Sequence, residues 1–302
     1  MPAVSLHALL AHSIDYAGMF PPCSLPLDRA VENHAHYVRS PDAWMLNSFV
    51  LPLEKFEAAA EQVSRFDKKH PLRVSALGPR TQNAAEFIAA LKAAAQTIAA
   101  FKREHVDLIA VPQLEIAMPE DVDLARLREG RAQLSELKLQ LFVEAPADSA
   151  ERTLGLIAQL KDPGVGYKLR TGGVTADAFP SIAQIGAALS AAMQRHVPIK
   201  FTAGLHHPLR QFRDEVGTQM HGFLNVLGAA VLAAEHHWDE GQIAQVLEDE
   251  GAGSFSFDET IFAWRDWEIA TDRIHARRKL VTSFGSCSFD EPGEDLRALN
   301  VL

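Results

Sequence analysis

Two short apolar runs with one lysine each decide the fold of this chain: residues 164–173 read Gly-Val-Gly-Tyr-Lys-Leu-Arg-Thr-Gly-Gly, and residues 197–208 read Val-Pro-Ile-Lys-Phe-Thr-Ala-Gly-Leu-His-His-Pro. Each run is typical of a buried strand that leaves a sheet and enters a glycine-containing loop. Residues 175–195 between them have helical character. The order strand, helix, strand predicts a β-α-β unit, so the two strands are expected to be parallel neighbours.

The same alternation of strand-like and helix-like segments continues along the chain. The strand-like segments are 44–51, 72–77, 106–111, 139–144, 165–170, 198–202, 254–258 and 282–289. The helix-like segments are 54–69, 83–103, 122–137, 150–161, 176–195, 221–236 with 241–250, 260–280 and a tail helix at 293–299, and residues 26–39 are expected to form an extra helix before the first strand. Eight such repeats favour a closed (β/α)8 TIM-type barrel over an open sheet.

The chain shows no linker rich in proline, serine or glycine and no long run of charge. We therefore expect a single (β/α)8-barrel domain over residues 1–302, with an extra N-terminal helix and segment. Residues 221–236 could also form a strand, although their apolar residues recur at helical spacing. Residues 283–289 form either the eighth strand or an irregular segment. Residues 15–22 are too irregular for a helix, and Asp15 and Tyr16 either cover one barrel end or reach the site.

The composition limits the classes of partner. The chain has 302 residues, is 47% hydrophobic and carries a net charge of −10, which is not the charge of a protein that binds nucleic acid or an anionic membrane. Neither a membrane span nor a basic signal-peptide region is evident in the sequence. The two cysteines, Cys23 and Cys287, do not make a disulfide framework, so a reducing cytoplasm is expected. A small anionic metabolite is the expected partner, and assembly into a homo-oligomer is left open.

Polar side chains gather where the expected strands end, which is where parallel α/β folds place their ligand site. In chain order they are Glu115, Glu144, Lys168, Arg170, Thr171, Lys200, Thr202, then His206, His207 and Arg210 in the following loop, then Asp258 and Glu259, and finally Cys287, Asp290 and Glu291. Such an ordered set predicts a binding site at one end of the barrel.

Lys168 and Lys200 suggest amine chemistry. A lysine beside another cation in a dry pocket has a lowered pKa, and its free amine can form a Schiff base with a carbonyl group. We expect Lys168 to be this nucleophile and Lys200 to lower its pKa and bind an anion. In the alternative interpretation each lysine forms a structural ion pair with Glu144 or Glu115 inside the barrel.

The remaining candidates suit anion binding and proton transfer. Arg170, Arg210 and the turn Thr171-Gly172-Gly173 are typical of a phosphate or carboxylate site, because glycines let backbone amides approach the anion. Glu144 or a loop histidine, His206 or His207, would move protons. Cys287 is expected to be a small buried residue, and whether it reaches the site is left open.

Both lysine strands resemble a known family. Lys168-Leu169-Arg170-Thr171-Gly172 resembles the Lys-x-x-Thr-Gly around the Schiff-base lysine of deoxyribose-phosphate aldolases, and Lys200-Phe201-Thr202-Ala203-Gly204 is similar to the second-lysine strand of that family, Lys-x-x-Gly-Gly. Residues 106–109 resemble its strand-three acidic segment. That family carries its lysines on strands six and seven, whereas the count above places them on strands five and six.

The chain as a whole also resembles a bacterial and plant family of (β/α)8-barrel proteins known only as uncharacterised. The resemblance is carried by the segments Lys-x-Arg-Thr-Gly-Gly, Ala-Gly-Leu-His-His-Pro and Phe-Gly-Ser-Cys-Ser-Phe-Asp-Glu-Pro. It implies no activity.

Three functions follow from these patterns. The favoured one is an aldolase-type lyase that acts on a small anionic carbonyl or sugar-like metabolite through Lys168 and requires no cofactor. The second is a metal-dependent isomerase, epimerase or hydrolase, in which Glu115, Glu144 and His206 or His207 hold a divalent metal. The third is a non-catalytic barrel that binds a metabolite, because a barrel fold by itself implies no activity.

Overall fold

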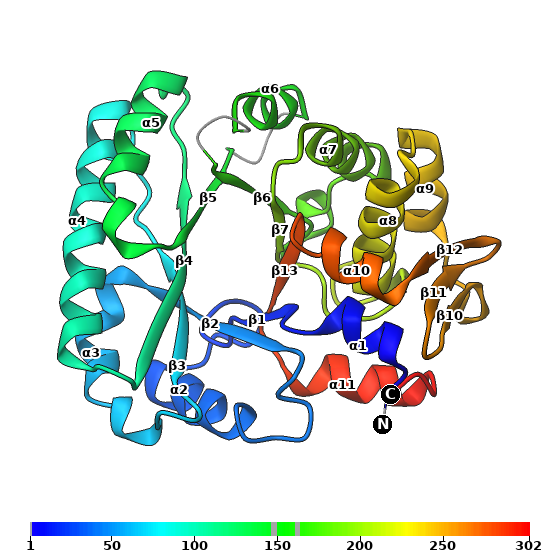
Figure 1. Ribbon diagram of the computed structural model, residues 1–302, viewed down its shortest axis with the longest axis horizontal. Helices are drawn as coiled ribbons and strands as arrows, with labels where there is room; N and C mark the ends of the chain where they lie inside the picture. Colours follow the sequence, from blue (N-terminus) through cyan, green and yellow to red (C-terminus); the bar gives the residue numbers. More distant parts are fainter. Residues whose placement is uncertain (1, 146–149, 161–163) are drawn as a thin grey trace.

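The computed structural model describes residues 2–145, 150–160 and 164–302. Eight parallel strands close into a barrel (Figure 1). In barrel order they are β1 (Ile14–Tyr16), β2 (Leu46–Pro52), β3 (Leu72–Leu77), β4 (Ile109–Ala117), β5 (Gln140–Glu144), β6 (Gly166–Arg170), β7 (Ile199–Thr202) and β13 (Val281–Ser286), which pairs with β1. The predicted (β/α)8 TIM-type barrel is thereby confirmed.

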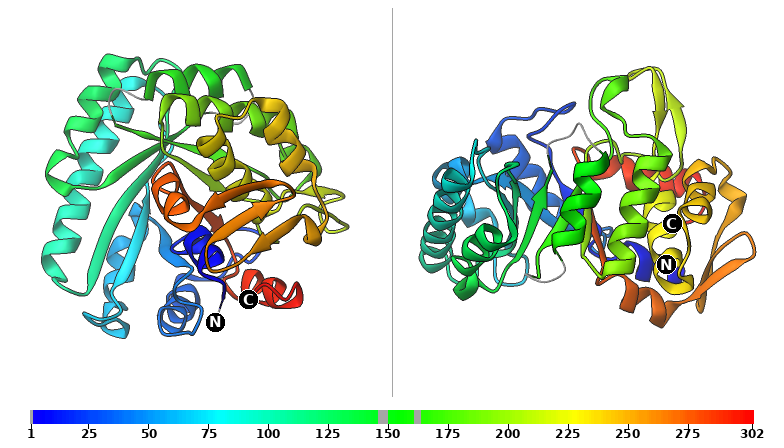
Figure 2. Two further views of the ribbon diagram at one scale, coloured as in Figure 1. Left: turned by 45° about the vertical axis from the view of Figure 1, so that its right-hand side comes forward. Right: turned by 90° about the horizontal axis from the view of Figure 1, so that it is seen from above.

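Helices surround the barrel (Figure 2). They are α1 (Val4–Leu10) before the first strand, then α2 (Leu27–Tyr37), α3 (Phe56–Ala60), α4 (Ala84–Glu104), α5 (Leu124–Ala132), α6 (Ala150–Leu160), α7 (Ile182–Arg195), α8 (Phe223–His236), α9 (Glu240–Glu248), α10 (Thr271–Arg277) and α11 (Asp290–Ala298). Residue 161, the expected last residue of the helix at 150–161, lies outside the described residues.

Local sequence explains two helices that position the site. Helix α7 begins at a capping box, in which Ser181 and Gln184 each bind the other's backbone amide, and its last turn closes at His196 in the left-handed conformation. Helix α8 is apolar on all sides, as the run from Phe223 to Ala234 requires, because it is buried among α7, α9 and the barrel. Residues 221–236 are therefore largely helical, as their spacing predicted.

Helix α4 bears on the expectation that the chain contains no membrane span. By length and composition it is the one helix in the described part of the chain that could cross a membrane. Its Phe87, Leu91 and Ile98 are fully buried against the rest of the protein. Helices that cover a core meet the same criterion, so α4 alone is a weak indication of a membrane span.

The first barrel strand is the main correction to the expected topology. β1 covers only Ile14–Tyr16, and residues 26–39, expected as an extra helix before the barrel, contain α2, which follows this strand. The extra N-terminal helix is α1 instead. β1 is recognisable only in three dimensions, because its three residues are too few for a period-two pattern and it depends on pairing with β2 and β13.

The segment expected as the seventh strand lies outside the barrel. Residues 255–257 form β10 (Phe255–Phe257), which pairs antiparallel with β11 (Ile261–Trp264), and β11 pairs with β12 (Trp267–Ala270). The helix expected at 260–280 is therefore shortened to α10. Aromatic and β-branched residues favour these strands, and a tight turn at Arg265, which has a positive φ of 51°, reverses the chain.

The loop after β7 adds a two-stranded antiparallel ribbon, β8 (Gln211–Arg213) and β9 (Thr218–Met220).

The barrel strand β4 begins at Ile109 and not at 106, and it extends to Ala117. Gln113 and Glu115 are consequently inside the strand, whereas the sequence placed them after its end. Their two-residue spacing sends both side chains into the barrel.

Candidate active site

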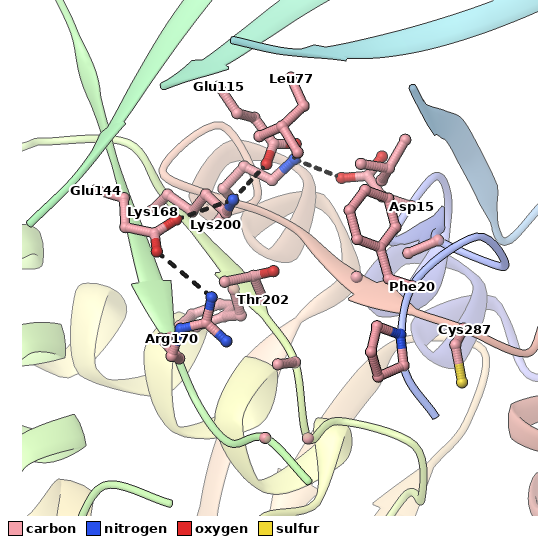
Figure 3. A pocket seen from close by; sticks show the side chains of 18 of the residues that line it. Asp15, Phe20, Leu77, Glu115, Glu144, Lys168, Arg170, Lys200, Thr202 and Cys287 are labelled. Carbon is pink, nitrogen blue, oxygen red and sulfur yellow. Dashed lines mark hydrogen bonds and ion pairs between the residues drawn. The ribbon is translucent and has the colours of Figure 1, made fainter. Parts of the chain in front are cut away.

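A cavity of about 430 Å³ lies at the mouth of the barrel where the strands end (Figure 3). Its polar lining residues are Asp15, Arg80, Glu115, Glu144, Lys168, Arg170, Lys200, Thr202 and His206. Apolar residues complete the wall, among them Phe20, Pro21, Val50 and Leu77. Figure 3 shows Arg170 and Thr202 on one side of this cavity, and Phe20 and Cys287 on the other.

Lys168 and Lys200 form the centre of the site. They are direct partners in the parallel pairing of β6 and β7, so their side chains point to the same face of the barrel wall. Lys168 is 6% exposed and Lys200 is 1% exposed. Because β1 is the first strand, the lysines occupy the sixth and seventh strands and not the expected fifth and sixth. This is where the deoxyribose-phosphate aldolases, which the two motifs resemble, carry theirs.

Glu115 bridges the two lysines. Its Oε2 lies 2.9 Å from Lys168 Nζ, and its Oε1 lies 2.5 Å from Lys200 Nζ and accepts a hydrogen bond from the Ser75 hydroxyl. Burial by itself raises the pKa of Glu115, but the two ammonium groups outweigh burial and hold the pKa well below its usual range. Glu115 is therefore a carboxylate.

The expected lowering of the Lys168 pKa is wrong. Burial does lower the pKa of Lys168, but Glu115 and Glu144, both 2.9 Å from Nζ, outweigh burial and raise the pKa above its usual value. Lys168 is an ammonium ion in the resting protein. The ion pairs with Glu144 and Glu115, offered as the alternative in the sequence analysis, are thus present.

Asp15 is the second carboxylate at Lys200 and connects several strands. Its Oδ2 lies 2.7 Å from Lys200 Nζ and accepts hydrogen bonds from Ser283 of β13 and Gln113 of β4. Its Oδ1 accepts a hydrogen bond of 2.7 Å from Asn47 of β2. Full burial with this many donors keeps a charged group stable inside the barrel.

Arg170 is more accessible than either lysine of the site. Its guanidinium lies 3.5 Å from Glu144, and its side chain is 36% exposed. It therefore keeps accessible donors for an incoming anion, whereas both lysine ammonium groups are buried and each already contacts two carboxylates. The structure brings together Glu144, Lys168, Arg170, Lys200, Thr202 and Glu115 from the expected set.

Other expected residues lie behind the cavity wall and not in its lining. The Thr171 hydroxyl donates a hydrogen bond to the Ala203 carbonyl, and Gly172 packs against Gly204, so both residues hold the ends of β6 and β7 together. Gly173 does line the cavity. Arg210 lies 3.4 Å from the ring of His221, outside the lining.

The two adjacent histidines point to different surroundings. His206 lines the cavity, and its Nδ1 lies 3.4 Å from Glu291 and 3.9 Å from the Cys287 sulfur. His207 instead pairs with Asp295 of α11 at 2.6 Å. Within residues 2–145, 150–160 and 164–302, no group of three or more His, Cys, Asp or Glu side chains is placed to hold a metal ion.

The remaining candidates lie elsewhere. Asp258 caps the turn between β10 and β11, and Glu259 is exposed beside it. Both residues lie outside the cavity lining, because the segment expected as the seventh strand is not part of the barrel. Asp107 of the segment 106–109 is exposed and pairs with Lys68. Asp290 accepts a hydrogen bond from Tyr37. Cys287 is buried and lines the cavity, and Asp15 reaches the site, whereas Tyr16 is buried and absent from the lining.

Several lining and supporting residues escaped the sequence analysis. Ser75, Gln113 and Ser283 donate to the buried carboxylates, and Phe20 and Arg80 line the cavity. Serine and glutamine inside strands carry only a weak signal, namely a polar residue at an inward position.

A scan against models of protein families found no match, and a search of curated proteins found none either. Among solved structures, the chain is similar to QR15, an aldolase, with 12% identity and a TM-score of 0.45 over 64% of this chain and 80% of that one. It is also similar to the carboxyl transferase domain of Rhizobium etli pyruvate carboxylase with pyruvate, with 12% identity and a TM-score of 0.43 over 99% of this chain and 56% of that one. A longer Rhizobium etli pyruvate carboxylase chain, with acetyl coenzyme A, matches at 12% identity and a TM-score of 0.41 over 78% of this chain and 21% of its own.

These similarities are too low to carry an argument about activity. The pairing of the eight strands is sufficient for the fold, and the chain is a (β/α)8-barrel protein of the TIM type.

Proposed function

We propose that this barrel is an aldolase-type lyase that acts on a small anionic carbonyl compound through a Schiff base on Lys168. One observation carries the proposal: a buried lysine amine lies in the wall of a cavity, 2.9 Å from Glu144, with a second lysine beside it and an accessible arginine on the same side. A nucleophile, a proton acceptor and an anion-binding group are thereby within reach of one bound molecule.

The raised pKa of Lys168 sets the first step. Glu144 takes a proton from the ammonium group, the free amine attacks the substrate carbonyl carbon, and loss of water gives the imine. The protonated imine accepts the electron pair of the bond between the α- and β-carbons of the substrate as this bond breaks, which gives an enamine. The β-hydroxyl group gives its proton to a base and leaves as a carbonyl product, and protonation and hydrolysis of the enamine release the second product and the free amine of Lys168. Glu115 keeps its negative charge throughout, because Lys200 remains paired with it.

Lys200 consequently has a different role from the one expected. Its ammonium group contacts Asp15 and Glu115, and it lies 5.5 Å from the centre of the Phe142 ring. It holds the two carboxylates in place, and Arg170, with Arg80 also in the lining, is available to a substrate anion. The apolar wall formed by Phe20, Val50 and Leu77 suits the uncharged part of the substrate.

Borohydride reduction tests the proposal. Glyoxylate, an anionic aldehyde, is incubated with the protein and reduced, and the adduct is located by peptide mass mapping. We expect one adduct on Lys168, formed at a lower concentration of glyoxylate than of neutral acetaldehyde. Lys168→Arg keeps the charge but cannot form an imine, so it should abolish the adduct. Lys92→Arg, at an exposed position of α4, is the matched control. Adducts spread over surface lysines, unchanged in Lys168→Arg, would reject the proposal.

A non-catalytic barrel is the second candidate, and the complete pairing of both lysines favours it. Each ammonium group contacts two carboxylates, which is the arrangement of a structural ion-pair network. Calorimetry with glyoxylate on Lys168→Arg separates the two: binding that survives this substitution, with no adduct in the native protein, would support a binding function.

A further inference from the structure

The two cysteines of the chain meet at the mouth of the cavity. The sulfur atoms of Cys23 and Cys287 lie 3.1 Å apart although 264 positions separate them in the sequence. Cys23 is exposed, whereas Cys287 is buried and lines the cavity. Neither is used in the proposed mechanism. Two thiols so close, one of them open to solvent, can be joined with little movement of the backbone.

The segment that carries Cys23 is part of the cavity wall. Residues 17–25 connect β1 to α2, and Phe20, Pro21 and Pro22 of this segment line the cavity. The Ala17 amide donates to the Ser286 carbonyl, and the Leu25 amide donates to the Gly18 carbonyl. Between these two hydrogen bonds, the tip of the segment contacts the end of β13 through the two sulfur atoms. A covalent bond there would fix the tip against the cavity.

We propose that Cys23 and Cys287 form a reversible disulfide that fixes segment 17–25 over the cavity and so controls access to Lys168. The control of imine chemistry rests on the proposed function, whereas the cross-link itself does not. Reducing compartments keep most thiols reduced, and disulfides that form there are usually transient or regulatory.

The chemistry requires an oxidant, and a small disulfide such as oxidised glutathione supplies it. Burial raises the pKa of the Cys287 thiol to about 12, with its contact to Cys23 adding to the effect, so the exposed Cys23 reacts first. The Cys23 thiolate attacks the glutathione disulfide and releases one glutathione thiolate. Cys287 then attacks the mixed disulfide and expels the second glutathione. Its proton passes to the expelled thiolate or to His206, 3.9 Å away. Two protein thiols are oxidised and one glutathione disulfide is reduced to two thiols.

Thiol titration and peptide mapping in glutathione buffers test the cross-link. We expect the native protein to lose both of its titratable thiols and to yield a peptide pair joined through Cys23 and Cys287, with full recovery after dithiothreitol. Cys23→Ser should yield no internal cross-link. Ser24→Ala, at the adjacent exposed position, is the matched control and should behave as the native protein. Glutathione retained on Cys23 with no internal cross-link, or no oxidation at all, would overturn the proposal.

Two readouts test the effect on the segment. Amide hydrogen exchange within residues 17–25 should slow on oxidation in the native protein and stay unchanged in Cys23→Ser. The glyoxylate adduct on Lys168 should be lost on oxidation and regained on reduction. A cross-link that forms without slowing exchange would refute the control of access. Absence of the adduct in the reduced protein as well would count against the Schiff-base function. The exchange data would then still show whether the disulfide fixes residues 17–25.

Discussion

Lys168 shows how strongly the surroundings of one side chain decide its chemistry. Its neighbours along the sequence and on β7 are cationic, which suggests a free amine. The structure adds two carboxylates from β4 and β5, and these raise its pKa. Schiff-base formation at this lysine therefore begins from an ammonium ion, with Glu144 as the neighbouring proton acceptor.

The pH dependence of imine formation follows from this raised pKa. Below the pKa of Lys168 the fraction of free amine rises by about tenfold per pH unit, so the initial rate of adduct formation should increase from roughly pH 7 to pH 9. Glu144→Gln removes one of the carboxylates that raise the pKa, and its profile should move toward lower pH. The measurement is the initial rate of adduct formation with cyanoborohydride. A rate independent of pH would show that Lys168 is already uncharged.

Glu115 should contribute more to stability than any surface carboxylate. Glu115→Gln leaves two buried ammonium groups with less compensating charge, and we expect the free energy of unfolding to fall by about 3–5 kcal/mol. Glu129→Gln, which breaks an exposed pair with Arg126, should change it by less than about 0.5 kcal/mol. Urea unfolding of both variants provides the measurement.

Glu115→Gln also tests how the free energy of unfolding depends on pH in the acid range. The folded pKa of Glu115 lies below its usual value of 4.5, so its contribution is complete above that pH and is lost as the pH falls toward the folded pKa. The native protein should lose stability more steeply than Glu115→Gln below about pH 4.5. Parallel acid limbs would mean that Glu115 does not titrate in this way.

The ends of β6 and β7 lie close together because Gly172 and Gly204, which meet there, have no side chains. A Cβ atom on Gly172 would lie 2.9 Å from the Cα of Gly204, and Gly204 itself has a φ of +76°. Gly172 and Gly204 thus serve the close approach of two loops, and Gly204 also lines the cavity, as does Gly173. This approach places Lys168 and Lys200 side by side at the mouth of the barrel.

Gly172→Ala should separate the two strand ends. The added methyl group meets backbone that cannot move aside, so we expect a loss of about 1–3 kcal/mol in the free energy of unfolding. Gly155→Ala in α6 has open space around the new methyl group and should be neutral or stabilise the protein by about 0.5–1 kcal/mol. Thermal and urea unfolding compare the two. Equal behaviour of the variants would show that the loops relax apart freely.

Closure of the barrel depends on its shortest strand. β1 has three residues, and it pairs with β2 on one side and β13 on the other. Its central residue, Asp15, also reaches Lys200 of β7 and Gln113 of β4 through the interior. A short strand that forms few backbone hydrogen bonds is thus secured by charge inside the barrel.

Asp15→Asn should therefore weaken the barrel as a unit. It keeps the shape of the side chain but removes a charge from beside the buried Lys200, and we expect a loss of about 3–5 kcal/mol in a single cooperative transition. Asp266→Asn, at an exposed turn between β11 and β12, is the control and should remain within about 0.5 kcal/mol of the native protein. Guanidinium unfolding gives both values. A small change in the free energy of unfolding of Asp15→Asn would show that backbone pairing of β1 is sufficient to close the barrel.

The sequence by itself determined the alternation of strands and helices, the barrel class, and the adjacency of Lys168 and Lys200 on neighbouring strands. These features are encoded locally, because hydrophobic period, capping residues and glycine turns act over a few residues. Helix α7 between the two lysine strands is an example: the sequence predicted a helix over 176–195, and the structure has it over Ile182–Arg195, where the capping box of Ser181 and Gln184 begins it later than predicted.

Only the tertiary structure decided which strand begins the barrel, that residues 255–257 lie outside it, and whether Lys168 is charged. Pairing of β1 with β13 joins residues about 270 positions apart, and the local hydrophobic pattern of the sequence does not predict such a contact. The pKa of Lys168 depends on the competition between burial and carboxylates supplied by β4 and β5. That competition is set by distances of about 3 Å between strands distant in the sequence, which composition and spacing do not contain.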